Sequence, residues 1–342
     1  MKKLLNTLYV TSPDSWLHCD GENVVVKIGG EERFRMPFHN LESIISFGRA
    51  GASPALMSAC ASKNIGLSFM SEGGAFMARV TGVANGNVVV RRRQYRLADS
   101  GEEALKIASS IIAAKISNSR KILERHIRDY GGRNDISSVK KVSNLLGYAK
   151  SDAAKARSAA ELRGIEGNAS KLYFSVFGEM ILNGDGAFGF EGRNKRPPKD
   201  RTNALLSFAY TLLAHDVHGA LESCGLDSYV GFFHTDRPGR AGLALDIMEE
   251  LRAYIADRNV LSFINRRQVK ASDFEDRGVN GVILKPDARR EFIRHWQRRK
   301  QDEMEHPFLS EKIKCGLIPY AQALLLNKFL RGELDAYPVF LI

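Results

Sequence analysis

The sequence predicts an α+β protein, with a small β-strand-rich domain over residues 1–90 and a larger, all-α domain over residues 91–342. Short apolar and β-branched runs, separated by Gly, Asp, Asn and Glu, fill the first part of the chain. Later in the chain, apolar residues recur every three or four positions, which is the period of a helix. A chain of 342 residues is long enough to bury a core in each of two domains.

The strands expected in the first domain are LNTLYVT, NVVVKI, ESIISF, IGLSFM and FMARVTG. One helix is expected among them, from Pro54 to about Asn64. Ser53 can accept a hydrogen bond from an unpaired N–H of the first turn, and proline suits that turn. The opening MKKLLNTLYV fits an edge strand better than a secretory signal, because Asn6 and Thr7 interrupt its apolar run.

Helices are expected from Ser100 onward, where Ser100 and Glu103 form a capping box. This first long helix should end at Gly131–Gly132. Asp152 is expected to cap a further helix that runs towards Glu166. Other helices are expected in NALLSFAYTLLAHDVHGALES, ALDIMEELRAYIADR and ARREFIRHWQRRK. The domain boundary should fall near residues 85–100, because the apolar period changes there.

The positive charge of the chain lies mainly in its second part. The formal net charge is +11; residues 1–85 hold 8 Lys and Arg against 7 Asp and Glu, which leaves 42 against 32 for the rest. Such a surplus suits a polyanion such as DNA, although solubility alone would also explain it. The four cysteines lie far apart without a C-x-x-C pair, which favours the cytoplasm. No segment approaches the roughly 18 apolar residues of a membrane span.

Two segments carry candidate metal ligands in separate parts of the sequence. In RGIEGNASKLYF, Glu166 is either a metal ligand or one half of a salt bridge. In GFFHTDRPGR, an apolar run ends at His234, and Arg237 and Arg240 follow. An imidazole can bind a metal, and guanidinium groups can hold phosphate oxygens. The alternative for this second segment is a surface loop with a capping histidine.

A third segment, GLALDIMEELRAY, places three carboxylates along one side of a helix. Asp246, Glu249 and Glu250 are spaced at i, i+3 and i+4. Like charges repel, so this spacing is typical of a solvated surface or of a cation site, and the apolar neighbours favour the cation. Oxygen ligands with one imidazole suit Mg²⁺ or Mn²⁺ rather than structural zinc. Such ions catalyse phosphoryl transfer, so the all-α domain is the expected catalytic domain.

Basic residues gather in two further segments. In EGRNKRPPKDRTNALLSF the basic residues are Arg193, Lys195, Arg196, Lys199 and Arg201. They either follow a DNA backbone or form an ordinary charged linker. Around Trp296, the basic residues include Arg289, Arg290 and Arg294. They either contact phosphates or form a solvated helix face. His215 and His218, three residues apart, are better explained by core packing or capping than by a metal.

Taken together and in this order, these segments resemble the CRISPR adaptation integrase, the family that inserts new spacers into a CRISPR array. The matching stretches are GGAFMARVTGVANGNVVVRRRQYR, RGIEGNASKLYF, RNKRPPKDRTNALLSFAY and FFHTDRPGRAGLALDIMEELR, which span most of residues 73–252. The four stretches in this order are far more specific for the family than any one stretch alone. It is most similar to the integrases of type I systems, subtype I-C among them.

The resemblance implies a dimerising β-domain and a helical catalytic domain with a metal site. Matched motif to motif, the metal ligands are Glu166, His234 and Glu249, with Asp246 close by. Two positions depart from the family pattern. Gly242 stands where serine is common, and Ala253 stands where proline often follows the acidic helix.

The implied reaction is attack by the 3′-hydroxyl of a short DNA duplex on a phosphodiester at the edge of a CRISPR repeat. Hydrolysis uses the same chemistry with water as the nucleophile, so endonuclease activity is expected too. The family works with a small ferredoxin-like partner protein, whose dimer joins two integrase homodimers in a heterohexamer. One rival function is a general metal-dependent nuclease that acts on branched DNA. The other is a non-catalytic DNA-binding scaffold, and a scaffold would not need Glu166, His234 and Glu249 together.

Overall fold

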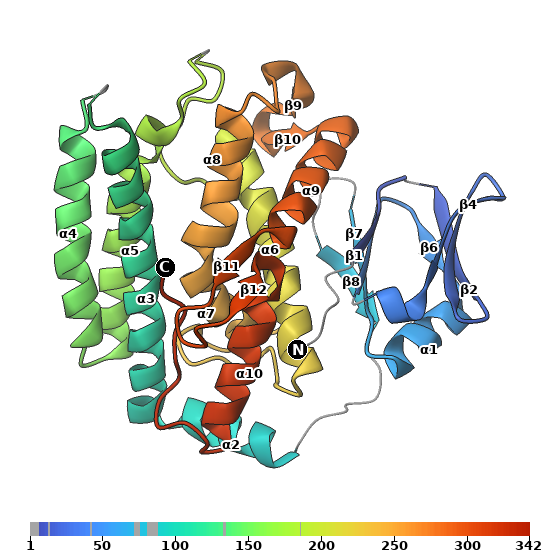
Figure 1. Ribbon diagram of the computed structural model, residues 1–342, viewed down its shortest axis with the longest axis horizontal. Coiled ribbons are helices and arrows are strands. Elements are labelled where there is room, and N and C mark those ends of the chain that lie inside the picture. The colour runs from blue at the N-terminus through green and yellow to red at the C-terminus, as the bar shows by residue number, and fades with distance from the viewer. Residues whose placement is uncertain are drawn as a thin grey trace. The chain divides into compact units, whose positions relative to one another are not determined.

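Strands come first along the chain and helices follow, which confirms the predicted α+β class (Figure 1). The computed structural model describes residues 7–12, 14–41, 43–71, 76–80, 88–132, 135–184 and 186–342. Contacts divide the chain into two compact units. One unit comprises Met1–Asn85 and Lys285–Gln301, and the other comprises Gly86–Leu284 and Asp302–Ile342. The predicted limits, 1–90 and 91–342, do not include this return of the chain to the first unit.

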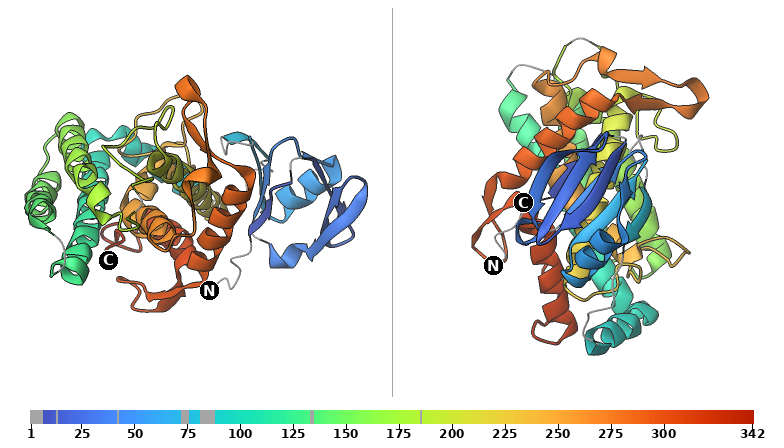
Figure 2. Two further views of the ribbon diagram at one scale, coloured as in Figure 1. Left: turned by 90° about the horizontal axis from the view of Figure 1, so that it is seen from above. Right: turned by 90° about the vertical axis from the view of Figure 1, so that its right-hand side faces the viewer.

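The β-rich unit contains two four-stranded sheets, seen from further directions in Figure 2. The first sheet has the order β1 (Thr7–Val10), β5 (Ser43–Phe47), β7 (Gly66–Met70), β8 (Phe76–Val80). The second has the order β4 (Glu31–Pro37), β3 (Asn23–Ile28), β2 (Ser15–Asp20), β6 (Gly51–Ala52). In the first sheet β1, β5 and β7 are parallel and β8 is antiparallel to β7. In the second, only the β2–β6 pair is parallel.

All five predicted strands are present, but β2, β4 and β6 were not predicted. The strand β4, EERFRMP, has no buried residue, so its sequence lacks the alternation that marks a half-buried strand. The strand β6 has only two residues. The ends of three predicted strands, Leu5–Asn6, Glu42 and Thr81–Gly82, lie outside the described residues.

Apolar side chains from both sheets form the core of this unit, among them Leu17, Val24, Ile44 and Leu67, all fully buried. Helix α1 (Pro54–Ser62) contacts strands of both sheets and adds Leu56 and Cys60 to the core. Its predicted start is confirmed, because the Ser53 hydroxyl accepts from the N–H of Leu56 at 3.2 Å. The later helix α9 (Pro286–Gln301) belongs to the same unit and buries Phe292 and Trp296.

The helices of the second unit are α2 (Val88–Asp99), α3 (Gly101–Tyr130), α4 (Ser137–Ala154), α5 (Ala159–Ser175), α6 (Arg201–Ser223), α7 (Gly242–Leu251), α8 (Arg258–Asn265) and α10 (Ile318–Leu330). Two antiparallel strand pairs accompany them, β9 (Phe274–Asp276) with β10 (Val282–Leu284) and β11 (Glu303–Glu305) with β12 (Lys312–Lys314). The domain that was predicted as all-α is therefore mainly helical rather than free of strands. The predicted start of α3 is confirmed, since the Ser100 hydroxyl accepts from the N–H of Glu103. No helix among the described residues is long and apolar enough to cross a membrane.

Two helix predictions are wrong in detail. Asp152 lies inside the last turn of α4, which was not predicted, and Ser158 caps α5 by accepting from the N–H of Glu161 at 3.1 Å. Ser158 and Glu161 have the spacing of a capping box, so the correct start was readable in the sequence. The predicted helix ALDIMEELRAYIADR is divided by a π-helical segment, Arg252–Asp257. Such segments often accompany functional sites.

Candidate active site

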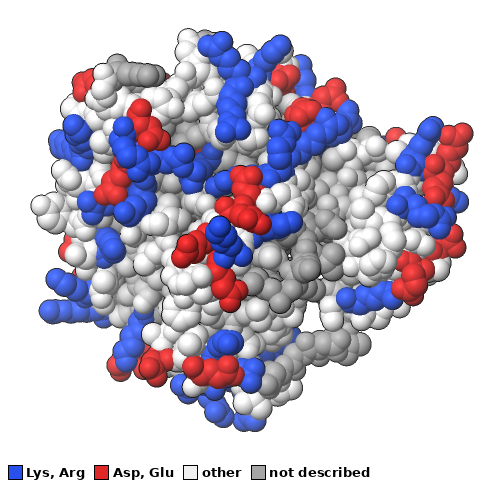
Figure 3. All heavy atoms as spheres, viewed as in Figure 1, with Lys and Arg blue, Asp and Glu red and all other residues white. Residues whose placement is uncertain are grey.

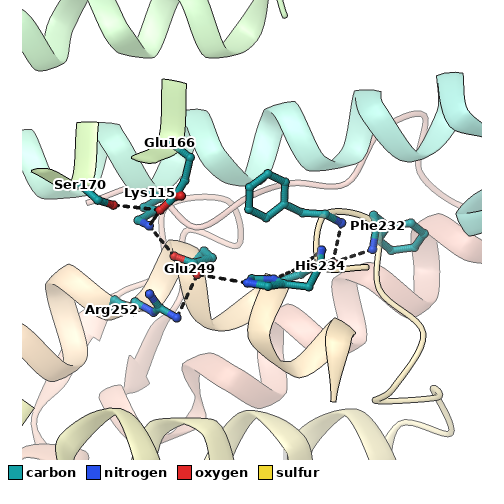
Figure 4. A network of polar contacts seen from close by, with 9 residues as sticks. Lys115, Glu166, Ser170, Phe232, His234, Glu249 and Arg252 are labelled. Carbon is teal, nitrogen blue, oxygen red and sulfur yellow. Dashed lines mark hydrogen bonds and ion pairs between the residues drawn. The ribbon is translucent and has the colours of Figure 1, made fainter. Parts of the chain in front are cut away.

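Three elements of the helical unit bring the predicted ligands together (Figure 4). Glu166 comes from α5, Glu249 from α7, and His234 from the loop before α7. Nε2 of His234 lies 3.9 Å from Oε1 of Glu249. The ammonium of Lys115, on α3, lies between the two glutamates. It contacts Oε1 of Glu166, which also accepts from the Ser170 hydroxyl at 2.9 Å, and it lies 2.7 Å from Oε2 of Glu249.

Asp246 fixes the orientation of His234. Its Oδ1 lies 2.6 Å from Nδ1 of the ring, and its two oxygens also accept from the backbone N–H groups of Phe232, Phe233 and His234. A carboxylate can only accept, so Nδ1 donates the proton. In the neutral ring, Nε2 then keeps its lone pair on the side of Glu249. Histidines that bind metals are usually held in this way by a carboxylate.

Two glycines allow the loop of His234 to approach α7 so closely. A Cβ atom at Gly231 would lie 2.6 Å from Oδ2 of Asp246, and one at Gly242 would lie 2.7 Å from the carbonyl oxygen of Tyr229. Both distances are shorter than any van der Waals contact. The backbone N–H of Gly242 donates to that same carbonyl at 3.0 Å. The glycine at position 242, where the family often has serine, therefore suits the loop that this chain has.

Glu249 is the most strongly perturbed acid of the site. It is 3% exposed, and Arg252 donates to its Oε1 at 2.9 Å. Burial alone would raise the pKa of Glu249, but the charges of Arg252 and Lys115 outweigh it and lower the pKa to about 2. Glu249 is therefore held as a carboxylate, the form that binds a cation.

Glu250 has a different role from its neighbour. Its carboxylate accepts from the amide of Gln322 at 3.0 Å, the hydroxyl of Tyr337 at 2.5 Å and the N–H of Phe340 at 2.8 Å. Burial raises its pKa to about 7, although these hydrogen bonds oppose the change. Glu250 thus fastens the C-terminal segment to α7. Of the three acidic residues on α7, Glu249 lies at the centre of the site, Asp246 lies behind His234, and Glu250 lies outside the site.

The donor set fits Mg²⁺ or Mn²⁺, because it consists of two carboxylates and one imidazole nitrogen. As the side chains stand, no three His, Cys, Asp or Glu residues in the described ranges converge closely enough to hold an ion. In this arrangement the Lys115 ammonium lies between Glu166 and Glu249. Of the two alternatives for Glu166, the salt bridge is present, with Lys115 as its partner, and the role as a metal ligand stays a prediction. Gly164 and Gly167 face open space, so no second helix approaches there.

Hydrogen bonds hold some of the basic side chains in the loop before α6. Arg193 donates to Oδ1 of Asn203 at 2.7 Å and to the Ser207 hydroxyl at 3.0 Å, and Arg201 donates to the carbonyl of Ala187 at 2.8 Å. The other three basic side chains of the loop are exposed, namely Lys195, Arg196 and Lys199. Although the Lys195 side chain is exposed, the surrounding protein removes part of its hydration, and this desolvation together with the charges of Arg252 and Arg193 lowers its pKa.

The remaining basic residues differ in exposure. Arg237 is exposed and Arg240 is half-buried. On α9, Arg290 pairs with Asp287 and Arg294 with Glu291, whereas Arg289 is buried, with its guanidinium 5.9 Å from the centre of the Phe47 ring. Arg289 therefore packs inside the β-rich unit, and we leave it out of the DNA-binding set. On the face drawn in Figure 3, the β-rich unit at the right carries basic and acidic side chains side by side.

Comparison with known proteins identifies the family to which the chain belongs. Residues 8–298 match the family described as CRISPR associated protein Cas1. The chain belongs to this family. The CRISPR-associated endonuclease Cas1 1 of Chlorobaculum tepidum is 46% identical over 340 residues, 99% of each chain. The CRISPR-associated endonuclease Cas1 2 of Rhodospirillum rubrum is 48% identical over 342 residues, 99% of this chain and 98% of the relative. A solved CAS1 protein from Thermotoga maritima has the same fold, with a TM-score of 0.84 over 97% of this chain and 99% of that one, at 22% identity.

Two residues of the site in this Cas1-family chain were not predicted, Lys115 and Arg252. Lys115 sits between the buried residues Ala114 and Ile116 on α3 and is itself only 11% exposed. A lone lysine on the apolar side of a long helix was the available signal, because such a charge needs a partner. Arg252 lies three residues after Glu249, within pairing distance on a helix.

Proposed function

We propose that this chain is the integrase of CRISPR spacer acquisition, a metal-dependent DNA endonuclease and transesterase. The observation that carries the proposal is that Glu166 and Glu249 lie on either side of Lys115, while the imidazole of His234, held by Asp246, lies 3.9 Å from Glu249. Membership of the Cas1 family supports it. So do the two relatives of nearly the same length, both named as CRISPR-associated endonucleases.

In the proposed reaction, a 3′-hydroxyl of a short duplex attacks a phosphodiester at the edge of a CRISPR repeat. A new P–O bond forms, the bond from phosphorus to the old 3′-oxygen breaks, the attacking hydroxyl loses a proton and the leaving oxygen gains one. Glu166, His234 and Glu249 would hold Mg²⁺ or Mn²⁺, which would polarise the phosphoryl oxygen and lower the pKa of the attacking hydroxyl. Asp246 orients the ring so that, in the neutral imidazole, Nε2 carries the lone pair that would bind the ion.

Positive side chains beside these ligands would bind the reacting strand. Arg252 is half-buried against Glu249 and Tyr210, and its guanidinium lies 5.1 Å from the centre of the tyrosine ring, which fixes its direction. The exposed Lys195 lies near it on the basic loop. Phosphate oxygens are held well by guanidinium and ammonium groups placed in this way.

A strand-transfer assay tests the proposal. A labelled duplex with free 3′-hydroxyls is incubated with a plasmid that carries a repeat, Mn²⁺ and the protein. We expect Glu166→Gln and His234→Ala to reduce joining by at least about 100-fold. Glu102→Gln, which alters an exposed carboxylate on α3, should leave joining unchanged. Cleavage without any joined product would instead support a general nuclease on branched DNA.

We also propose that the chain works as a homodimer through its β-rich unit and binds a small ferredoxin-like partner in a heterohexamer. The exposed edge strand β4 and the two-residue strand β6 end the second sheet, and unprotected sheet edges favour pairing between chains. Light scattering of the full chain should give twice the chain mass of 38.0 kDa. A monomer at high micromolar concentration would contradict the dimer.

A further inference from the structure

Lys115 is the residue of this site to which the proposed function gives no task. Its ammonium contacts carboxylate oxygens on two different helices, Glu166 on α5 and Glu249 on α7. Its side chain is 11% exposed and that of Glu249 is 3% exposed, so little water reaches the contact. Two carboxylates facing one another in such a place repel unless a cation lies between them. Lys115 is that cation.

We propose that Lys115 is a built-in counter-ion that competes with the divalent metal for Glu166 and Glu249. This inference rests on the proposed function, because it assumes that the same two carboxylates bind the metal. An ammonium donates hydrogen bonds and accepts none, so it cannot become a ligand. It occupies the space between the oxygens and would repel a divalent ion in contact with them. Metal binding therefore requires Lys115 to withdraw.

Arg252, the other cation at Glu249, is not the group that withdraws. It contacts only Oε1 of Glu249, and its guanidinium lies over the Tyr210 ring. Lys115 alone bridges both glutamates, so its departure frees one oxygen on each of them. A lysine on its flexible four-carbon stem also moves more readily than a stacked guanidinium.

A small cavity beside the site adjoins Lys115. The cavity has a volume of about 20 Å³, and Lys115, Ser170, Tyr173, Tyr210 and Asp257 are among the residues that line it. This is room for one water-sized group, and an ammonium is about that large. Asp257 supplies an opposite charge there, with its Oδ1 2.7 Å from the hydroxyl of Tyr210. Arg252 lines the same cavity and shares the charge of Asp257, so the cavity gives the ammonium room to move away from the glutamates while it stays beside an acidic group.

Manganese affinity of the purified full chain tests the inference, measured by the loss of the free Mn²⁺ signal in electron paramagnetic resonance. Lys115→Gln should bind Mn²⁺ at least about tenfold more tightly than the wild type, because the competitor is gone, and should melt at a lower temperature without Mn²⁺. Lys115→Arg keeps the charge and should not bind more tightly. The matched control is Lys106→Gln, on the exposed side of the same helix, which should change nothing.

Equal or weaker Mn²⁺ binding by Lys115→Gln would overturn the proposal. Glu166→Gln separates this failure from failure of the proposed function. If Glu166→Gln abolishes Mn²⁺ binding while Lys115→Gln leaves it unchanged, only the competition is refuted; if Glu166→Gln binds normally, the metal site itself is wrong. Should Lys115→Gln fail to fold without metal, a crystal structure of the wild type with Mn²⁺ decides. Lys115 still bridging both glutamates beside the bound ion would overturn the proposal.

Discussion

The basic loop before α6 should control DNA affinity without taking part in the chemistry. Its exposed cations are Lys195, Arg196 and Lys199, and within the described part of the chain none of them forms an ion pair with an acidic side chain. Arg193 and Arg201 are excluded from the test because they are bound to α6 and to the preceding turn. We therefore consider the triple variant in which each of the three exposed cations becomes glutamine.

The expected magnitude follows from counterion release. Each phosphate contact contributes about 0.9 to the slope of log affinity against log salt, so three lost contacts flatten the slope by about 2.7. Between 50 and 200 mM salt, a fourfold change, the wild type should lose about 40-fold more affinity than the triple variant. Fluorescence anisotropy of a labelled duplex over a salt series measures both slopes.

The control removes the same charge elsewhere. Lys140, Lys141 and Lys150 are exposed on α4, and their replacement by glutamine should leave the slope unchanged. Glu166→Gln should keep wild-type affinity or exceed it slightly, because a carboxylate repels DNA, while strand transfer disappears. The reasoning is refuted if the loop variant keeps the wild-type slope, if the α4 variant flattens it equally, or if Glu166→Gln loses binding and joining together.

Two other substitutions test acidic residues that lie behind or beside the proposed metal ligands. Asp246→Asn should weaken Mn²⁺ binding about 10- to 100-fold, because the amide cannot reproduce the acceptors that orient His234; unchanged binding in a titration would contradict this role. Burial raises the pKa of Asp257 from 3.8 to about 6, although Tyr210 donates to it. The folded state thus holds this proton more tightly, so the free energy of unfolding should fall as pH rises from 3.8 to about 6, by about 3 kcal/mol from this group. Urea denaturation should show that Asp257→Asn removes this part of the pH dependence, and a variant with the wild-type profile would count against it.

Features that depend on neighbouring residues alone could be predicted from the sequence. Ser53 and Ser100 cap their helices as expected, because a cap needs only an oxygen and an N–H three residues later. The strands β3, β5 and β7 carry enough apolar residues to be recognised. The strand β4 does not, because its residues pair with β3 through the backbone while their side chains stay in solvent.

The acidic residues and the histidine of the site could be predicted from the sequence, but the role of each acidic residue could not. Asp246, Glu249 and Glu250 all lie along one side of a helix, so their spacing does not separate them, and only the family resemblance favoured Glu249. Packing separates them, because the C-terminal segment reaches Glu250 from one direction and α3 and α5 reach Glu249 from another. Lys115 was missed for the same reason, since its partners are 51 and 134 positions later in the chain.

Anomalous diffraction from a crystal soaked in Mn²⁺ tests most directly whether one metal centre performs the chemistry. We expect a single strong peak between the side chains of Glu166, His234 and Glu249, with Asp246 behind the imidazole and Glu250 out of reach. A peak at another place, or no peak here together with normal strand transfer by Glu166→Gln, would contradict the account.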